Sequence, residues 1–182
     1  WQLPLVLFGE GGGGRPGDTD TAGVAGLDVT TFKKFAELSG KVPIISVVSG
    51  RCFAGNAAMV GCSDVIIATA DSNIGMGGPA MIEGGGLGVY KPEDIGPISV
   101  QTANGVVDIA VSDEQEAVAA AKKYLSYFQG NVETWEAEDQ RELRHLIPEN
   151  RLRAYDVRTV INTLADRESV LELRKDFGIG IQ

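Results

Sequence analysis

Three short apolar runs alternate with segments of helical periodicity, and this alternation constrains the fold more than any other feature. The runs are "LPLVLF" at 3–8, "KVPIISVVSG" at 41–50 and "SDVIIAT" at 63–69. The short, continuous run at 3–8 is consistent with a strand buried on both faces, and the other two runs predict a second and a third strand. Between them, "LDVTTFKKFAELSG" at 27–40 and "FAGNAAMVGC" at 53–62 predict helices. This order predicts an α/β fold with right-handed crossovers and a mostly parallel sheet.

The first predicted helix carries its own boundary signals. Phe32, Phe35 and Leu38 share one face, Asp28 can cap the start and Gly40 can end the helix. Residues 113–129, "DEQEAVAAAKKYLSYFQ", predict a second strong helix that opens with acidic residues.

From residue 130 onward the composition becomes polar and charged, interrupted by Pro148. We expect a compact unit over 1–129, a helical connector over 130–176 and the first residues of another strand over 177–182. Trp1 is followed at once by a strand-like run, and the chain stops as a new alternation begins. Both ends therefore look cut from a longer protein.

Charge and cysteine content exclude several classes of function. The net charge is −9, which argues against nucleic-acid and anionic-membrane surfaces. Apolar runs fall well short of the ~20 residues that span a bilayer. Cys52 and Cys62 form neither a CxxC pair nor a disulfide framework, so we expect a reduced, cytoplasmic environment.

Four consecutive glycines, Gly11 to Gly14, follow the first strand-like run. Each costs backbone entropy on folding, so the stretch belongs where the backbone takes positive φ or lies against a ligand. "GGGRPG" at 12–17 satisfies GxGxxG, but Pro16 and "DTDTAG" precede any helix, which disfavours a dinucleotide fingerprint. A phosphate-binding P-loop is excluded because GK[ST] is missing.

Side-chain nucleophiles and bases are poorly represented. The one histidine, His145, lies in a charged helical segment and is best interpreted as a surface residue. Cys52 precedes a predicted helix, yet without a neighbouring histidine it is better interpreted as a structural thiol, and Cys62 as a core residue. A metal site is not expected.

The remaining candidate for chemistry is a set of backbone N–H groups. "GRCFAGNAAM" at 50–59 turns through glycine from a strand into a helix, and its small residues allow a ligand to approach free N–H groups. Close helix–sheet packing is the structural alternative for the same residues. Two N–H-rich turns after neighbouring strands are the arrangement of an oxyanion hole for a thioester enolate.

Long motifs over almost the whole chain resemble a known family. "PLVLFGEGGGGRPGDTD", "PIISVVSGRCFAGNAAMVGCSDVIIATADSNIGMGGPAMIEGGGLGVY", "AKKYLSYFQG" and "IPENRLRAYDVRTVINTLAD" resemble the carboxyltransferase component of biotin-dependent acyl-CoA carboxylases. The resemblance is to the latter part of the N-terminal half. It implies the ClpP/crotonase-like fold, built from stacked ββα units, with residues 130–176 as the connector to the second half.

The resemblance also implies roles for individual residues. The family's first glycine turn falls on Gly11 to Gly14 and Arg15, and its "GP" turn, near the acyl-group passage, on Gly78 and Pro79. Its second turn, whose amides are oxyanion donors in the family, falls on Phe53, Ala54, Gly55, Asn56 and Ala57. The expected catalytic positions are Gly55 and Asn56. The expected substrate-binding positions are Gly12, Gly13, Gly14, Arg15, Phe53, Ala54, Ala57, Gly78 and Pro79. Asn56 replaces the usual glycine, which keeps the backbone amide but can narrow the pocket or add a contact.

The implied reaction is transfer of a carboxyl group from carboxybiotin to the α-carbon of an acyl-CoA through an enolate. Biotin carboxylase, a biotin carrier, the C-terminal half and further copies of the chain are the implied partners, and an isolated piece is expected to be inactive. An enoyl-CoA hydratase or isomerase, with Glu83 as its candidate acid/base, and an inert piece with a binding role are the alternatives. A ClpP-type protease is disfavoured because "GNAAM" has no serine.

Overall fold

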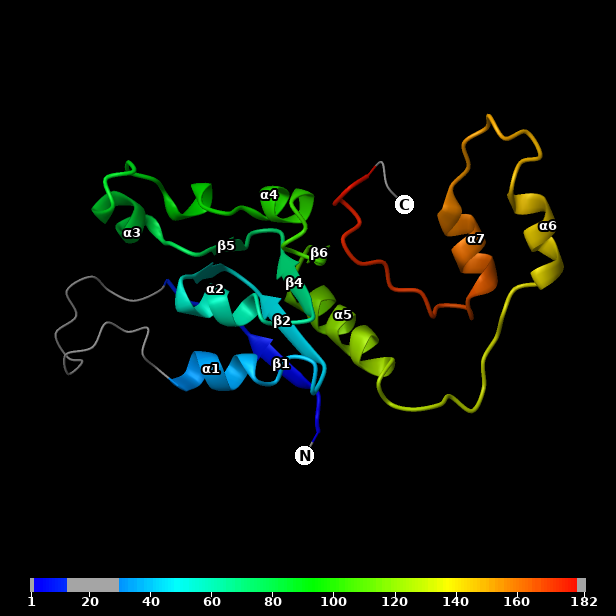
Figure 1. Ribbon diagram of the computed structural model, residues 1–182, viewed down its shortest axis with the longest axis horizontal. Helices are drawn as coiled ribbons and strands as arrows, with labels where there is room; N and C mark the ends of the chain where they lie inside the picture. Colours follow the sequence, from blue (N-terminus) through cyan, green and yellow to red (C-terminus); the bar gives the residue numbers. More distant parts are fainter. Residues whose placement is uncertain (1, 13–29, 180–182) are drawn as a thin grey trace.

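The computed structural model describes residues 2–12 and 30–179, and its centre is a four-stranded parallel sheet. The strand order is β1–β2–β4–β6, with bounds Leu5–Phe8, Ile44–Val48, Val65–Thr69 and Ile109–Val111. Two three-residue strands, β3 (Arg51–Phe53) and β5 (Asn73–Gly75), pair in parallel as a second sheet. The predicted parallel α/β architecture is confirmed (Figure 1).

Among the described residues before 130, five helices and a 3₁₀ turn connect the strands of the two sheets or follow them. In chain order they are α1 (Thr30–Ala36), α2 (Gly55–Val60), α3 (Pro79–Gly84), the 3₁₀ turn η1 (Pro92–Asp94), α4 (Ile98–Ala103) and α5 (Glu114–Ser126). Helix α5 packs against β2, β4 and β6, and α1 packs against α2. Asp113 caps α5 by accepting a hydrogen bond from the Glu116 amide at 2.9 Å, so the predicted helix over 113–129 is confirmed.

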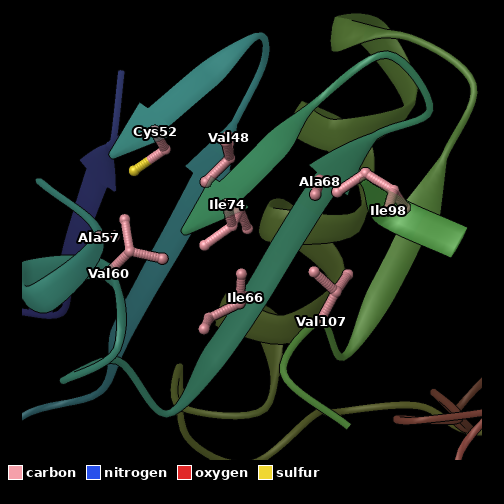
Figure 2. Packing of buried hydrophobic residues seen from close by; sticks show 9 residues of the cluster. All are labelled: Val48, Cys52, Ala57, Val60, Ile66, Ala68, Ile74, Ile98 and Val107. Atoms are coloured by element: carbon pink, nitrogen blue, oxygen red, sulfur yellow. The ribbon is translucent and has the colours of Figure 1, made fainter. Parts of the chain in front are cut away.

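The core has two layers because β2 and β4 are buried on both faces. Alternate residues of these strands point to opposite sides of the sheet. One layer joins Val48, Ile66 and Ala68 to α2, α4 and the second sheet, as Figure 2 shows. The other joins the remaining alternate residues to α5; its members are Ile45, Val47, Val65, Ile67, Ala117 and Ala121. The second and third predicted strands are confirmed as β2 and β4.

The prediction that the first strand is buried on both faces is wrong. β1 pairs with β2 alone in the main sheet and alternates between half-buried and exposed residues. Val6 and Phe8 are exposed, whereas Leu7 packs on the core. A continuous apolar run does not distinguish a central strand from an edge strand, because that difference depends on which elements cover each face.

The first predicted helix is shorter than its pattern. α1 spans Thr30–Ala36, Phe35 is buried, and Gly40 follows at φ 73° in the turn beyond the helix. The predicted cap Asp28 lies outside the described residues.

Residues beyond 130 contain less helix than expected. The described elements there are η2 (Gln140–Glu142), α6 (Leu143–Leu146) and α7 (Val157–Leu164). Figure 1 shows α6 and α7 apart from the sheet, joined to α5 by an extended segment. Residues 177–179 lie in a turn, and the remainder of the strand predicted over 177–182 lies outside the described residues.

A buried carboxylate attaches the end of the described chain to the sheet. Asp108, 7% exposed, accepts a hydrogen bond from the Ile66 amide and another from Nε of Arg174, both at 2.8 Å. The amide of Arg174 donates to the Asp108 carbonyl, and the Phe177 ring lies against Gly105. The segment around residue 174 is therefore held at β4 and β6.

We predict that Asp108→Ala lowers the free energy of unfolding by about 1–3 kcal/mol, because it leaves the buried Ile66 amide without an acceptor. Urea denaturation followed by circular dichroism measures the change. Arg141→Gln breaks the exposed pair with Asp139 and is the control, expected within about 0.5 kcal/mol. Equal effects of the two variants would contradict this role for Asp108.

Candidate functional site

The described part of the first glycine turn, residues 9–12 (hereafter the first turn), lies beside the second sheet. Gly9 donates to the Val47 carbonyl at 2.9 Å as the chain leaves β1. Gly11 then donates to the Arg51 carbonyl at 2.7 Å and accepts from the Phe53 amide at 2.9 Å. These bonds form a parallel bridge between Gly11 and Cys52, so residues 9–12 leave the main sheet and lie along β3.

The second turn is a sharp passage from β3 into α2. Its pivot is Ala54, with φ 54° and ψ −120°, a backbone conformation that residues with a Cβ rarely adopt. Such strain costs roughly 1–3 kcal/mol and persists only where the surroundings enforce it. Here the Ala54 amide donates to the Gly75 carbonyl at 3.0 Å, while its carbonyl accepts from Ala58.

The turn leaves three consecutive amides unused. No residue in the described ranges accepts a hydrogen bond from the N–H groups of Gly55, Asn56 and Ala57, and no side chain caps α2. The amides of Phe53 and Ala54 are already engaged by Gly11 and Gly75. The donors available to a ligand are therefore those of the first helical turn, where N–H groups lack intrahelical acceptors.

The third predicted element, Gly78–Pro79, adjoins both turns. Pro79 opens α3 and Gly78 is its N-cap residue. A Cβ placed on Gly78 would lie 3.3 Å from the Gly12 carbonyl oxygen and 3.4 Å from the Phe53 ring. The fold thus brings together Gly12, the second turn and the Gly78 turn. Gly13, Gly14 and Arg15 lie outside the described residues.

Several predicted site residues can present only their backbone. The Phe53 side chain is 1% exposed and forms the floor beneath Gly75 and Gly78. Ala57 is 6% exposed and belongs to the core layer of Figure 2. At Gly55 any side chain would meet the Phe32 ring, because a Cβ would lie 2.8 Å from Cζ.

Two contacts that the sequence did not specify complete the arrangement. Nδ2 of Asn56 donates to the Glu10 carbonyl at 2.8 Å, which links α2 to the first turn. Phe32 of α1 closes the space beside Gly55. Neither contact has a local sequence signal, since each joins residues more than 20 positions apart.

The side chains considered as nucleophiles or bases lie elsewhere or are deactivated. Cys52 is fully buried, and burial, followed by the charge of Glu10, raises the pKa of its thiol to about 11. His145 is exposed on α6, which Figure 1 shows far from α2. Glu83 is exposed near the end of α3. The geometry therefore offers backbone donors and no activated nucleophile among these three.

Cavity volume does not identify the site. A cavity of about 460 Å³ lies between α7 and residues 170–179, away from the glycine turns. Its walls combine aliphatic residues with charged ones. Arg158 and Glu172 form a bidentate pair with contacts of 2.5 and 3.0 Å, and Arg174 pairs with Asp108. Within residues 2–12 and 30–179, no cluster of three or more His, Cys, Asp or Glu could hold a metal ion. No helix in that part of the chain is long and apolar enough to cross a bilayer.

Comparison with known proteins identifies the class. The family described as "Carboxyl transferase domain" matches residues 2–181. The chain belongs to this family, and its fold is the crotonase-like fold of those carboxyltransferases.

Individual relatives agree with this assignment. A putative propionyl-CoA carboxylase beta chain of Bacillus subtilis is 29% identical over 99% of this chain and 36% of its own length. The methylmalonyl-CoA carboxyltransferase 12S subunit of Propionibacterium freudenreichii subsp. shermanii is 28% identical over 98% of this chain and 35% of its own. The chain therefore spans about a third of these relatives.

Solved structures give the same family. A single-chain, multi-domain long-chain acyl-CoA carboxylase superposes with a TM-score of 0.90 and 66% identity, over 97% of this chain and 17% of that one. The transcarboxylase 12S structure, a hexamer with methylmalonyl-CoA bound, superposes with a TM-score of 0.69 and 26% identity, over 81% of this chain and 31% of its own.

We predict that Cys52 resists alkylation by iodoacetamide at pH 8 in the folded protein, because its raised pKa keeps the thiol neutral. Mass spectrometry of native and urea-unfolded samples locates the label. The folded pKa lies above the ordinary 9.0, so this thiol stabilises the fold fully below pH 9, and the contribution is lost as pH rises toward 11. Rapid labelling of native Cys52 at pH 8 would contradict this prediction.

Proposed function

We propose that this chain forms the acyl-CoA side of a carboxyltransferase site in a biotin-dependent acyl-CoA carboxylase. The observation that carries the proposal is the set of three free amides, Gly55 to Ala57, on a strained turn beside Gly12 and Gly78. Membership of the carboxyl transferase family supports it. Catalysis here is electrostatic: the amides stabilise negative charge on a thioester oxygen as the enolate forms.

The chemistry asks little of protein side chains. Carboxybiotin, when bound, supplies the carboxyl group and a ureido nitrogen that accepts the α-proton. This chain holds the thioester carbonyl against the amides of α2 and keeps water from the developing enolate. Each such donor is worth roughly 2.7–4 kcal/mol of barrier in other enzymes. Biotin's ureido oxygen would also fit these amides; we assign them to the thioester because an apolar surface suited to an acyl chain adjoins the Gly78 turn.

The alternatives have less support. A hydratase or isomerase needs a glutamate over the thioester, and Glu83 is exposed near the end of α3. A serine protease would need a serine where α2 reads "GNAAMV". An inert piece with a binding or assembly role remains the second candidate, because the chain spans 36% of a typical relative.

In our proposal, carboxyl transfer requires further parts of the enzyme besides this chain. Residues 1–129 form part of the N-terminal half, 130–176 the connector and 177–182 the beginning of the C-terminal half. That half, a biotin carrier and a biotin carboxylase complete the reaction in a homo-oligomer, and an isolated chain binds acyl-CoA weakly without turnover. Isothermal calorimetry with CoA thioesters, biotin and NAD separates these proposals from a dinucleotide-binding function.

The amide of Gly55 is tested by a proline that removes its N–H group. Proline alone would strike the Phe32 ring, so both the proline and a control are placed in a Phe32→Leu background, which lacks the Cε1 and Cζ atoms that lie nearest. We expect Phe32→Leu/Gly55→Pro to lower kcat at least ~100-fold relative to Phe32→Leu/Gly55→Ala, because one oxyanion donor is lost.

Carboxylation of acyl-CoA by the complete enzyme is the assay, with circular dichroism on the same samples. The alanine variant adds the same Cβ and keeps the N–H group, so packing changes cancel between the two. Equal kcat values in two folded variants would refute the assignment of the Gly55 amide.

We propose a long-chain acyl-CoA as the substrate. The 66% identical relative is a long-chain acyl-CoA carboxylase. Beside the Gly78–Pro79 turn, Met76, Met81 and Leu87 are 67%, 58% and 72% exposed, and flexible methionines adapt readily to a hydrocarbon chain. Burying a methylene is worth about 0.8 kcal/mol, or roughly fourfold in affinity, so a long chain gains from such a surface.

We predict that Met81→Gln lowers the ratio of kcat/KM for palmitoyl-CoA to that for propionyl-CoA by about fivefold or more, because the long chain loses apolar contact. Leu152→Gln is the control, since Leu152 is 94% exposed in the connector. An unchanged ratio would count against the long-chain proposal and leave carboxyl transfer itself standing.

A further inference from the structure

The side chain of Asn56 fixes the first glycine turn against α2 although its own backbone amide is free. Nδ2 donates to the Glu10 carbonyl at 2.8 Å. The next residue, Gly11, is in a backbone conformation with φ 141°, and a Cβ there would lie 2.2 Å from Nδ2 of Asn56. The side chain therefore occupies the space beside Gly11 and holds the carbonyl just before it.

The same face of α2 makes a second contact with this segment. Val60 lies four residues after Asn56 and so on the same side of the helix. A Cβ on Gly9 would lie 2.4 Å from Cγ2 of Val60. Residues 9–11 thus lie flat on one stripe of α2, with apolar contact at Gly9 and a hydrogen bond at Glu10.

This hydrogen bond connects the two parts of the proposed site. Gly11 is bonded to Arg51 and Phe53, so the first turn is already registered along β3. β3 leads into α2 through the strained Ala54, without a hydrogen bond between the strand and the start of the helix. The side-chain amide of Asn56 adds a direct bond from α2 to the first turn, and so sets the position of that turn relative to the free backbone N–H groups.

We propose that Asn56 is a positioning residue, whose side chain holds the first glycine turn at a fixed separation from the amides of α2 through the Glu10 carbonyl. The proposal rests on the proposed carboxyl transfer for its catalytic consequence. The Nδ2 group is committed to Glu10, so the substrate meets the backbone amide of Asn56 and its side chain stays with the turn. Glycine at this position would leave the turn held by its bonds to β2 and β3 and by the contact of Gly9 with Val60, without the bond to Glu10.

Asn56→Leu is the test, because leucine matches the size of asparagine, favours helix and lacks the donor. Gln140→Leu is the matched control: it removes an amide that donates to the Thr163 carbonyl in the connector. In the complete carboxylase we expect Asn56→Leu to lower kcat about 3- to 10-fold, the range for one net hydrogen bond, with KM for acyl-CoA within twofold. The control is expected to leave kcat unchanged.

Hydrogen–deuterium exchange supplies a readout that needs no turnover. The Gly11 amide, bonded to Arg51, should exchange several-fold faster in Asn56→Leu than in the wild type, with little change in the melting temperature. A double-mutant cycle with Gly11→Ala tests the close contact between Gly11 and the Asn56 side chain. That change should be less damaging in an Asn56→Ala background, where the atom 2.2 Å from the new Cβ is absent.

The outcomes separate the two proposals. Unchanged exchange at Gly11 in Asn56→Leu, or equal effects of Gly11→Ala in both backgrounds, would overturn the positioning role whatever the enzyme does. A fall in kcat matched by a fall in melting temperature would also overturn it, since unfolding would explain the loss. A wild-type enzyme that carboxylates none of a panel of CoA thioesters would instead overturn the proposed function. Hydrogen–deuterium exchange at Gly11 would still test the contact between Asn56 and Glu10 in that case.

Discussion

The close approach of residues 9–12 to α2 is the contact on which the candidate site depends. Both Gly9 and Gly11 lie where a Cβ would enter the space of an α2 side chain, Val60 in one case and Asn56 in the other. A larger residue at Gly9 would meet Val60, and one at Gly11 would meet the Asn56 side chain, which would have to leave the Glu10 carbonyl. The two glycines therefore let residues 9–11 lie against α2 while Gly9 and Gly11 keep their bonds to Val47 and Arg51.

The sheet beneath makes this approach possible. β1, β2 and β4 are parallel, so their carboxyl ends share one edge of the main sheet. The first glycine turn follows β1 at that edge, and the second follows β3 of the second sheet, which the chain enters just after β2. Burial of β2 and β4 on both faces holds that edge rigid, between the layer of Figure 2 and the layer under α5. Rigid strands can therefore carry a strained residue such as Ala54 at the surface of the core.

A site made of backbone amides is not marked by the usual indicators, which are shifted pKa values and large cavities. Burial raises the pKa of the Cys52 thiol to about 11, the opposite of what a nucleophile needs. The cavity near α7 lies away from the turns. Free backbone amides neither titrate nor require a deep cavity, so they are found by asking which N–H groups lack an acceptor.

Local pattern sufficed for part of this protein. Periodicity and glycine placement determined α2 and α5, because each depends on neighbouring residues. The alternation of strands and helices determined that the sheet is parallel. The long motifs determined the family. Tertiary structure decided the rest: the exposed face of β1, the second sheet with its three-residue strands, the use of the Phe53 and Ala54 amides, and the bond from Asn56 to Glu10. Each of these joins residues far apart in the chain, and their energies arise only when folding brings both partners together.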